Sequence, residues 1–179
     1  RKILIKYSSI QYNCLNLPSK VIFKDGSTIA YIYGADGTKL RTVHQIGGTT
    51  TITEYYGNVI YENDTAKRLL TEVGYITLSD KKSHYYLQDH QGNNRVVLNE
   101  SGSVEEVNHY YPFGGLYTNS TNVQPYKYNG KELDTKKGLN WYDYGEVNKT
   151  GVWITYQYLE IKGNAEMTEN ANAVISEAI

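Results

Sequence analysis

Residues 27–58, STIAYIYGADGTKLRTVHQIGGTTTITEYYGN, decide the fold. They hold three β-prone runs, Ser27 to Tyr33, Lys39 to Ile46 and Thr49 to Tyr56, each followed by a short turn signal. The turn pairs Asp36-Gly37, Gly47-Gly48 and Gly57-Asn58 tolerate the positive φ angles that tight hairpin turns require. The run at 49–56 is almost wholly β-branched and aromatic and has no helical periodicity. This stretch therefore predicts antiparallel strands joined by tight turns.

The same pattern continues on both sides of this stretch. Turn pairs recur every ten or eleven residues from Asp25-Gly26 onward, and Lys67 to Leu78 continues the β-prone texture after the polar turn Asn63-Asp64. A second block has strand-like runs at 84–88, 95–99 and 104–111, and Pro112-Phe113-Gly114-Gly115 ends it. This spacing predicts a sandwich, a barrel or a continuous rolled sheet.

Tyrosine is the dominant aromatic residue, with 19 Tyr against 2 Phe and 2 Trp in 179 residues. Its apolar ring and polar tip suit half-buried positions on a pleated surface. Tyrosine pairs stand beside successive turns, as at Tyr55-Tyr56, Tyr85-Tyr86 and Tyr110-Tyr111. Imperfect units of this kind bury their faces on one another, which favours the rolled repeat sheet.

We divide the chain into an incomplete leading strand at 1–11, a β domain at 12–145 and a divergent tail at 146–179. The polar run Thr118 to Gln124 predicts an exposed loop. In the tail, Val152 to Ile161 is β-prone, and Asn164 to Ile179 has a capping residue and apolar residues at helical spacing. We expect a mainly β protein, a meander of antiparallel hairpins forming a curved or rolled sheet, with one short C-terminal helix. Because the chain begins with Arg, we interpret it as an internal or truncated fragment.

Charge and composition exclude several classes of function. The net charge is −1 and the basic residues are scattered, so we expect no nucleic-acid partner. No stretch approaches the roughly 20 apolar residues of a membrane helix, so we expect no membrane span. Cys14 is the only cysteine, which leaves no intrachain disulfide and no cysteine-based zinc site.

Three histidines and an aspartate are the first candidates for chemistry. Asp89 and His90 lie in a turn between strands that carry His84 and His109, a set that could bind a metal or hydrolyse a bond. An aspartate in such a turn usually accepts hydrogen bonds from local backbone amides. We therefore favour a structural role for Asp89 and His90.

Paired carboxylates are the second candidate, because glycosidases use two of them. Glu105 and Glu106 are strand neighbours and should point to opposite faces. Glu132 and Asp134 form the other pair, and we interpret Lys131 and Glu132 as a salt-bridged turn. We expect no catalytic, cofactor-binding or metal-binding residues, and a protein that is not an enzyme.

Two other functions stay open. The tyrosine pairs could stack on sugar rings, which would make the chain a carbohydrate-binding or adhesion module that uses Tyr110 and Tyr111 on surface glycans. Cross-strand packing is the favoured role, because the pairs occur in every unit. The tail from Glu146 could belong to an enzymatic toxin, although it offers no nucleophile, base and orienting group at suitable spacing.

Four stretches in order resemble the RHS, or YD-repeat, family, and specifically its bacterial repeat-associated core. These stretches are YNCLNLP at 12–18, YIYGADGTKL at 31–40, YLQDHQGNNRV at 86–96 with YYPFG at 110–114, and YNGKELD at 128–134 with GLNWYDYG at 138–145. The resemblance spans about residues 12 to 145 of this chain and is to the C-terminal part of that core. The positions that carry it are expected to be structural: Tyr33, Asp36, Gly37, Asp89, His90, Gly92, Arg95, Tyr110, Tyr111, Pro112, Phe113, Gly114, Gly130, Lys131, Glu132, Asp134, Gly138, Leu139, Tyr142 and Gly145.

The resemblance implies a long β-sheet strip that spirals into a hollow shell around a C-terminal toxin. The partners would be the remainder of the same RHS polypeptide and the enclosed toxin domain, and the place would be extracellular or at the cell surface. Family cores usually continue into an Ala-Arg-Tyr-Tyr-like segment and an Asp-Pro motif that supports self-cleavage. Here Glu146-Val147-Asn148 follows Gly145 and no Asp-Pro occurs, so self-cleavage is not carried over.

Overall fold

Twelve antiparallel strands form one sheet in which the spatial order of the strands repeats their order along the chain. The computed structural model describes residues 7–119 and 122–143. The strands are β1 Tyr7–Tyr12, β2 Pro18–Phe23, β3 Thr28–Tyr33, β4 Lys39–Ile46, β5 Thr49–Tyr56, β6 Val59–Glu62, β7 Thr65–Thr71, β8 Gly74–Thr77, β9 Lys82–Gln88, β10 Asn94–Asn99, β11 Val104–Tyr110 and β12 Leu116–Asn119. The expected meander of hairpins is confirmed.

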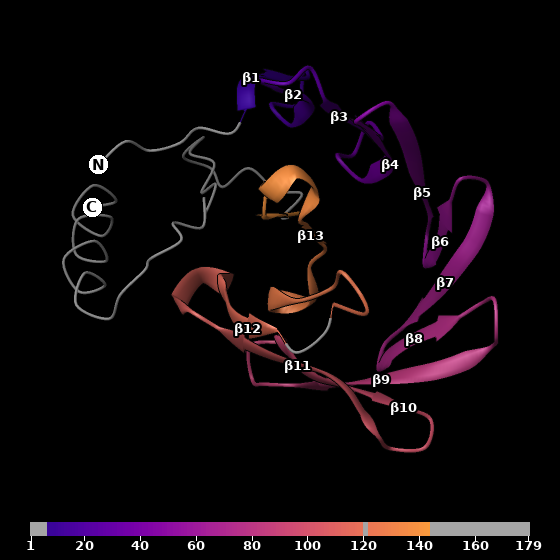
Figure 1. Cartoon of the computed structure of the whole chain (residues 1–179). Helices are drawn as coiled ribbons and strands as arrows, with labels where there is room; N and C mark the ends of the chain where they lie inside the picture. The colour runs from indigo at the N-terminus through magenta and orange to yellow at the C-terminus, as the bar shows by residue number, and fades with distance from the viewer. Residues whose placement is uncertain (1–6, 120–121, 144–179) are drawn as a thin grey trace, which may run out of the picture.

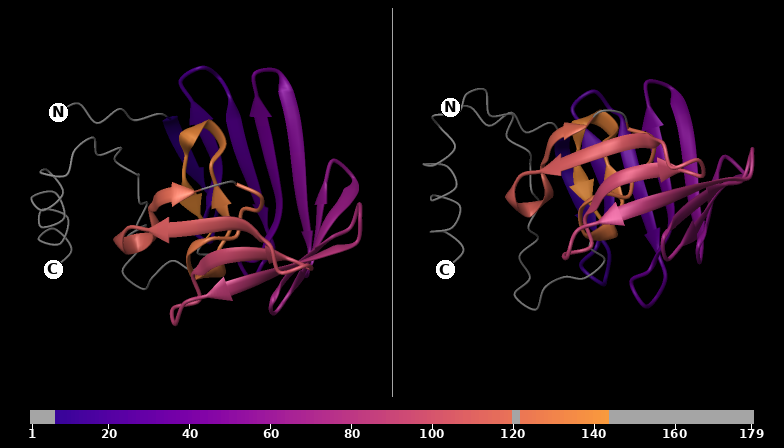
Figure 2. Two further views of the ribbon diagram at one scale, coloured as in Figure 1. Left: turned by 60° about the horizontal axis from the view of Figure 1, so that its bottom comes forward. Right: turned by 90° about the horizontal axis from the view of Figure 1, so that it is seen from below.

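The sheet curves around a later part of its own chain (Figures 1 and 2). We call residues 122–143 the inner segment, and the face of the sheet toward it the concave face. The inner segment contains the short turns η2 Tyr128–Gly130 and η3 Lys136–Gly138 and the paired strands β13 Leu133–Asp134 and β14 Trp141–Tyr142. The strand expected at 152–161 and the helix expected at 164–179 lie outside the described residues. Among the described helical turns, none is long and apolar enough to cross a bilayer.

One turn geometry recurs through the sheet and in the inner segment. The first residue donates its N–H to the carbonyl four positions on, and the fourth residue donates back to the first carbonyl. The fourth residue has a positive φ and is Gly at every such turn except Asn16. At the six of these turns that lie within the sheet, the bonds are those of a type I turn with a bulge at the fourth residue, a usual three-residue hairpin connection. The turn of the inner segment differs, because Asn129 also has a positive φ, of 50°. These turns begin at Asn13, Phe23, Gly34, Asp89, Asn99, Tyr111 and Lys127.

Two-residue turns join the strands between β4 and β8. Gly47 and Gly48 have φ values of 58° and 81°, and Asn63 and Asp64 have 48° and 60°, as type I′ turns require. The β-prone stretch from Lys67 to Leu78 forms parts of two strands, β7 and β8. The connecting residues, Glu72 and Val73, are not turn formers, so the sequence carries no local signal for this hairpin.

The core changes character along the concave face. Under β2 and β3 it is apolar, where Val21, Phe23 and Ile29 pack against Leu139 of the inner segment. Under β10 and β11 most of the buried side chains are polar: Asn94, Glu106 and Asn108 are each 0% exposed, beside the equally buried Val97. The inner segment is therefore held by apolar packing at one end and by polar contacts at the other.

The exposed loop expected at Thr118 to Gln124 is wrong in part. Thr118 and Asn119 belong to β12, which pairs with β11. Gln124 is buried, and its Nε2 donates to Glu106 at 3.3 Å. A polar side chain can be buried where it finds polar partners, and those partners are distant in sequence.

We expect Gly74→Ala to destabilise the fold strongly. A Cβ at position 74 would lie 1.9 Å from the carbonyl oxygen of His84 on the paired strand β9. That oxygen cannot move without disturbing the sheet, so urea unfolding should show a loss of roughly 2–4 kcal/mol in the free energy of unfolding. Gly57→Ala is the matched control, since its φ of +61° is strained but nothing lies within 4 Å. The control should lose only about 1 kcal/mol, and equal losses would contradict the steric argument.

Candidate functional site: the contact between sheet and inner segment

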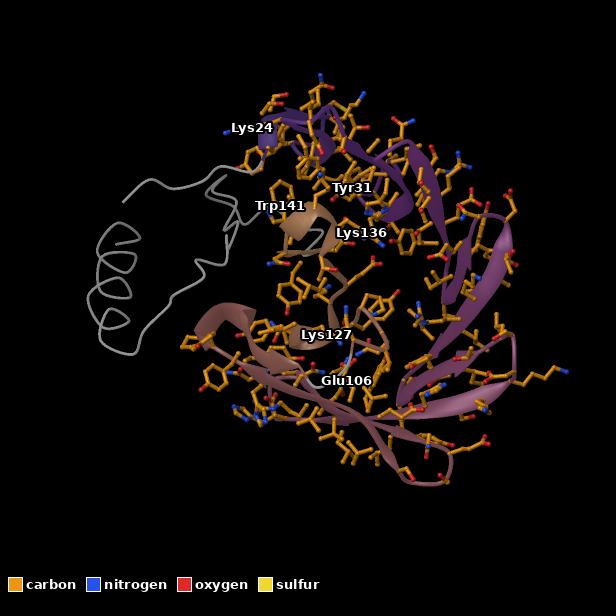
Figure 3. The ribbon with its side chains drawn as sticks, viewed as in Figure 1. Lys24, Tyr31, Glu106, Lys127, Lys136 and Trp141 are labelled. Carbon is orange, nitrogen blue, oxygen red and sulfur yellow. The ribbon has the colours of Figure 1, made fainter. Side chains whose placement is uncertain are left out.

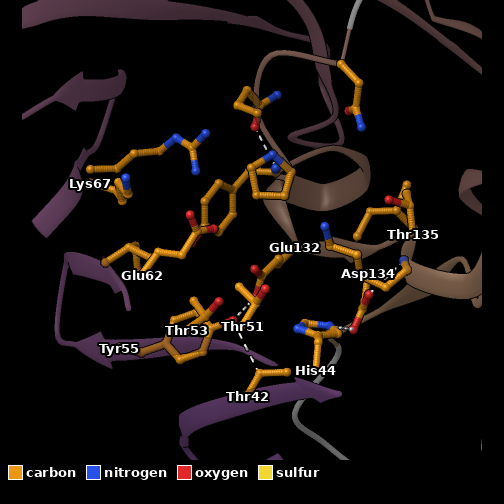
Figure 4. Close-up of a pocket in the computed structure, with 18 of the residues that line it drawn as sticks. Thr42, His44, Thr51, Thr53, Tyr55, Glu62, Lys67, Glu132, Asp134 and Thr135 are labelled. Atoms are coloured by element: carbon orange, nitrogen blue, oxygen red, sulfur yellow. Dashed lines mark hydrogen bonds and ion pairs between the residues drawn. The ribbon is translucent and has the colours of Figure 1, made fainter. Parts of the chain in front are cut away.

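A cavity of about 220 Å³ lies between strands β4 to β7 and the inner segment (Figure 4). Hydroxyl groups and charges dominate its walls. The residues that line the cavity include Thr42, His44, Thr51, Thr53, Tyr55, Glu62, Lys67, Glu132 and Asp134. The carboxylates of the inner segment in this set make ion pairs with the concave face, so the cavity marks the contact that holds the two parts together.

Asp134 of the inner segment is bound by two strands at once. Its Oδ2 accepts hydrogen bonds from His44 Nε2 at 2.9 Å and from the Tyr31 hydroxyl at 3.1 Å. Burial alone would raise the pKa of Asp134, but the hydrogen bond and charge of His44 outweigh it and hold that pKa below its ordinary value. Burial and the neighbouring carboxylate raise the pKa of Tyr31 well above its ordinary value. Asp134 is therefore a buried anion fixed to β3 and β4.

Glu132 makes a second set of contacts, with Lys39 and Tyr55. Its Oε2 accepts from Lys39 Nζ at 2.6 Å and from the Tyr55 hydroxyl at 2.7 Å, and Lys39 also lies 3.0 Å from Asp143. Burial would lower the pKa of Lys39, but the charges of Glu132 and Asp143 outweigh it and raise that pKa. The ion pair expected between Glu132 and its neighbour Lys131 is replaced by one with Lys39 of β4, and Lys131 is exposed.

Glu105 and Glu106 do not diverge as expected for strand neighbours. Val97 pairs with Glu106 and Leu98 with Val104, so Glu105 is an extra residue in a β-bulge. A bulge reorients the side chains on either side of it. Glu105 Oε2 reaches His84 Nδ1 at 2.5 Å, and Glu106 is fully buried against Lys127 of the inner segment. Both carboxylates therefore make their contacts on the concave face of the sheet.

The histidines and Asp89 do not converge on one site. His84 Nε2 lies 3.0 Å from the Thr77 hydroxyl, and its ring stacks on Tyr75 with centroids 4.3 Å apart. Asp89 accepts hydrogen bonds from the backbone amides of its own turn, while His90 is exposed. His109 Nδ1 lies 3.4 Å from Arg95. Among the described residues, no cluster of three or more His, Cys, Asp or Glu side chains could hold a metal ion.

The tyrosine rings of the last two motif stretches contact one another edge-on or at a tilt. Tyr128 packs between Tyr110 and Tyr142, with centroid distances of 5.7 and 6.1 Å. The Tyr142 hydroxyl donates to the Gly114 carbonyl at 2.8 Å, and a Cβ on Gly114 would lie 2.7 Å from the Tyr128 ring. These contacts join the turn after β11 to the inner segment.

The other motif positions also have structural partners. The Asp36 carboxylate accepts a hydrogen bond from the Thr38 amide in the turn that contains Gly37, and Asp89 accepts from backbone amides in the turn that contains Gly92. Gly130 is the fourth residue of the corresponding turn in the inner segment. Arg95 lies 3.7 Å from Asp89 and over the Tyr110 ring. Burial raises the pKa of Tyr33 to about 12. Pro112 and Phe113 begin the helical turn η1 Pro112–Gly114. Gly138 has a positive φ of 67°, and Leu139 is part of the apolar core. Gly145 lies outside the described residues.

The tyrosine pair Tyr110-Tyr111 does not form a flat exposed platform for a sugar. The Tyr110 hydroxyl donates to the Asn94 carbonyl at 2.7 Å, and the Tyr111 ring meets Tyr117 edge-on at 5.0 Å. Among the described residues, the most exposed tyrosines are Tyr56 and Tyr117, which lie on the separate strands β5 and β12. Carbohydrate binding stays a prediction from the sequence.

We expect Glu132→Gln to weaken the attachment of the inner segment. The change leaves the buried ammonium of Lys39 with less compensating charge, which should cost roughly 1–3 kcal/mol in urea unfolding. Glu62→Gln is the matched control, because Glu62 lines the same cavity but is exposed. That control should stay within about 0.5 kcal/mol of the unchanged chain. Similar effects of both changes would show that the Lys39 contact contributes nothing.

We expect the ionised carboxylate of Asp134 to stabilise the fold, so that the free energy of unfolding falls at low pH. Its unfolded pKa is about 3.9 and its folded pKa is lower. Its contribution is therefore complete above about pH 4 and is lost as the pH falls through the folded pKa. At pH 7, Asp134→Asn should unfold at a clearly lower urea concentration than the unchanged chain. This difference in unfolding midpoint should become smaller as the pH is lowered. For Asp64→Asn, in an exposed turn, the difference should be small throughout; a difference for Asp134→Asn that is independent of pH would contradict the assignment.

No protein-family model matches the chain, and no curated protein sequence matches it either. Solved structures do match. The crystal structure of TcdB2-TccC3-TEV aligns with a TM-score of 0.65 at 18% identity over 79% of this chain and 8% of that chain. The crystal structure of TcdB2-TccC3 aligns with a TM-score of 0.62 at 19% identity over 79% of this chain and 8% of that chain.

The Tc holotoxin pore of Photorhabdus luminescens aligns as well, with a TM-score of 0.60 at 19% identity over 76% of this chain and 8% of that chain. The chain thus spans about 8% of the length of the toxin-complex chains that it matches. At these identities the likeness is one of fold. The curved hairpin sheet with its inner segment has the fold of a small part of Tc toxin chains, which supports the RHS-like fold that the motifs predict.

Proposed function

We propose that this chain is a non-catalytic part of the wall of an RHS-type shell, which encloses or presents a toxin segment of the same polypeptide in competition between cells. The observation that supports this proposal is the curved sheet in sequence order with a segment of its own chain in the hollow (Figure 1). The matched structures come from toxin complexes, which supports a role in a toxin assembly.

The two edge strands of the described sheet are consistent with a larger sheet that continues beyond them in both directions. β1 and β12 each pair with one neighbour only among the described strands, so they are the two edges of the described sheet. The edge of a sheet is a place where a further strand can be added. The remainder of the same polypeptide is the natural source of that strand, and an extracellular or cell-surface location is part of the proposal.

The charges in the hollow fit a structural role. Lys39, Glu132, Asp134 and Lys127 are paired with groups across the contact between the inner segment and the concave face. Buried ion pairs of this kind require a defined partner and so hold a segment in one position. A wall that presents its inner segment in a fixed place needs this property.

Limited proteolysis of the full-length gene product tests the proposal. A shell should give one large resistant core that includes residues 7–143 and should protect the part of the polypeptide that it encloses. Ile29→Asp should abolish this protection, because Ile29 is 0% exposed in the apolar core and a buried unpaired charge is strongly destabilising. Ile32→Asp is the matched control on the same strand, since Ile32 is 48% exposed, and it should leave the resistant core intact.

Uniform digestion of the unchanged full-length product would overturn the shell proposal. So would a resistant core that leaves the enclosed part as sensitive to protease as a free peptide. Equal protease sensitivity of the two isoleucine variants would show that the concave face is not a buried surface.

A further inference from the structure

Lys127 and Glu106 form a charged pair in which both side chains are 0% exposed. Lys127 lies at the start of η2 in the inner segment, and Glu106 lies on β11 beneath it (Figure 3). The ammonium nitrogen Nζ contacts Glu106 Oε1 directly. Burying two charges costs several kcal/mol per ion unless hydrogen bonds compensate. The complete burial of this pair therefore calls for an explanation from the groups around it.

Asn108 shares the same carboxylate oxygen. It is also 0% exposed, and its Nδ2 donates to Glu106 Oε1 at 2.6 Å and to the Asn94 carbonyl at 3.1 Å. Two donors on one acceptor oxygen lie within about 6 Å of each other. The carboxamide of Asn108 and the amine of Lys127 are therefore neighbours that Glu106 bridges.

The amide oxygen of Asn108 stands out in this cluster. Asn108 Oδ1 is buried and has no hydrogen-bond partner among the described residues. An unsatisfied buried acceptor costs roughly 1–3 kcal/mol. Gln124 also donates to Glu106, at 3.3 Å, but its own Oε1 accepts from the Tyr126 amide at 2.5 Å. Asn108 is thus the carboxamide whose carbonyl is free to accept a proton.

The surroundings favour uncharged groups. Burial raises the pKa of Tyr86 and of Tyr110 above the ordinary value of a phenol. Burial also lowers the pKa of Lys127, against the opposing effect of Glu106. Because the site is shielded from water, burial disfavours the charged forms of both groups. Transfer of one proton from the ammonium to the carboxylate leaves a neutral amine beside a neutral acid. A neutral lysine amine is a nucleophile.

We propose that Lys127 and Asn108 become joined by an intramolecular amide bond, with Glu106 as the proton carrier. Lys127 Nζ attacks Asn108 Cγ, and a C–N bond forms while Glu106 moves the amine proton toward Nδ2. The Cγ–Nδ2 bond then breaks and ammonia leaves, so the atoms balance without an oxidant, a metal or a cofactor. The bond would fasten the inner segment covalently to β11, and this inference does not depend on the proposed function.

Intact mass spectrometry of the purified chain tests the bond, after circular dichroism and protease resistance have shown that the sample is folded. The chain should be about 17 Da lighter than its sequence requires, the mass of one ammonia. Lys127→Arg and Glu106→Gln should each restore the encoded mass. Lys131→Arg is the matched control, because Lys131 is an exposed lysine four positions further on, and it should keep the mass deficit.

Peptide mapping locates the bond and separates its alternatives. Trypsin finds no Lys or Arg between Val96 and Tyr126, so a free Lys127 gives peptide 96–127. A linked Lys127 resists cleavage and gives peptide 96–131, whose two ends stay joined after chymotrypsin has cut behind Tyr110. In Asn108→Asp the same bond should form with loss of water, about 18 Da.

The encoded mass in the folded, unchanged chain would overturn the inference, even if every variant failed to fold. A link that peptide mapping places on Gln124 or on Glu106 itself would overturn it too.

Discussion

The ion pairs between the concave face and the inner segment are the contacts on which the rest of the structure depends. A single sheet has two faces, and a stable domain must cover one of them with a second layer. Here the second layer is a short piece of the same chain with little regular structure. The apolar cluster around Leu139 covers only the first strands, so much of the remaining contact is made by charges, hydroxyls and tyrosine rings. Buried charges tolerate few alternative partners, which is why the inner segment occupies one position.

This constraint explains why the chain uses tyrosine where phenylalanine would fill the same space. The rings of Tyr31 and Tyr55 lie against the concave face, while their hydroxyls reach Asp134 and Glu132 of the inner segment. Tyr110 and Tyr142 use their hydroxyls on backbone carbonyls. Each ring supplies apolar surface and each hydroxyl supplies a hydrogen bond. The excess of Tyr over Phe is therefore a property of the contact with the inner segment as much as of the sheet.

The hairpins could be predicted from the sequence because their causes are local. A glycine or asparagine at a position with positive φ, next to an Asp or Asn that accepts backbone amides, is visible in the letters. The inward or outward direction of side chains could not be predicted where bulges interrupt the alternation. A register shift opposite Tyr33 brings both Lys39 and Thr42 to the concave side, and the bulge at Glu105 does the same for two successive glutamates.

The candidate site was the least predictable part, because its partners are distant in the chain. Lys39 and Glu132 are separated by 93 positions, and Tyr31 and Asp134 by 103. The sequence identified Glu132 and Asp134 as residues of interest, but it assigned Glu132 to its neighbour Lys131 instead of Lys39 and assigned no partner to Asp134. Lys127 carried no signal at all, because a lysine between two tyrosines reads as an exposed strand residue.

The strand order of the sheet has a consequence for synthesis on the ribosome. Since each strand pairs with the one made just before it, every hairpin can form as soon as its second strand has emerged, and no strand waits for a distant partner. The inner segment is different, because its binding surface exists only when β1 to β11 are in place. Translation in the N-to-C direction therefore delivers the inner segment after the twelve strands, when the hollow that receives it has already been built.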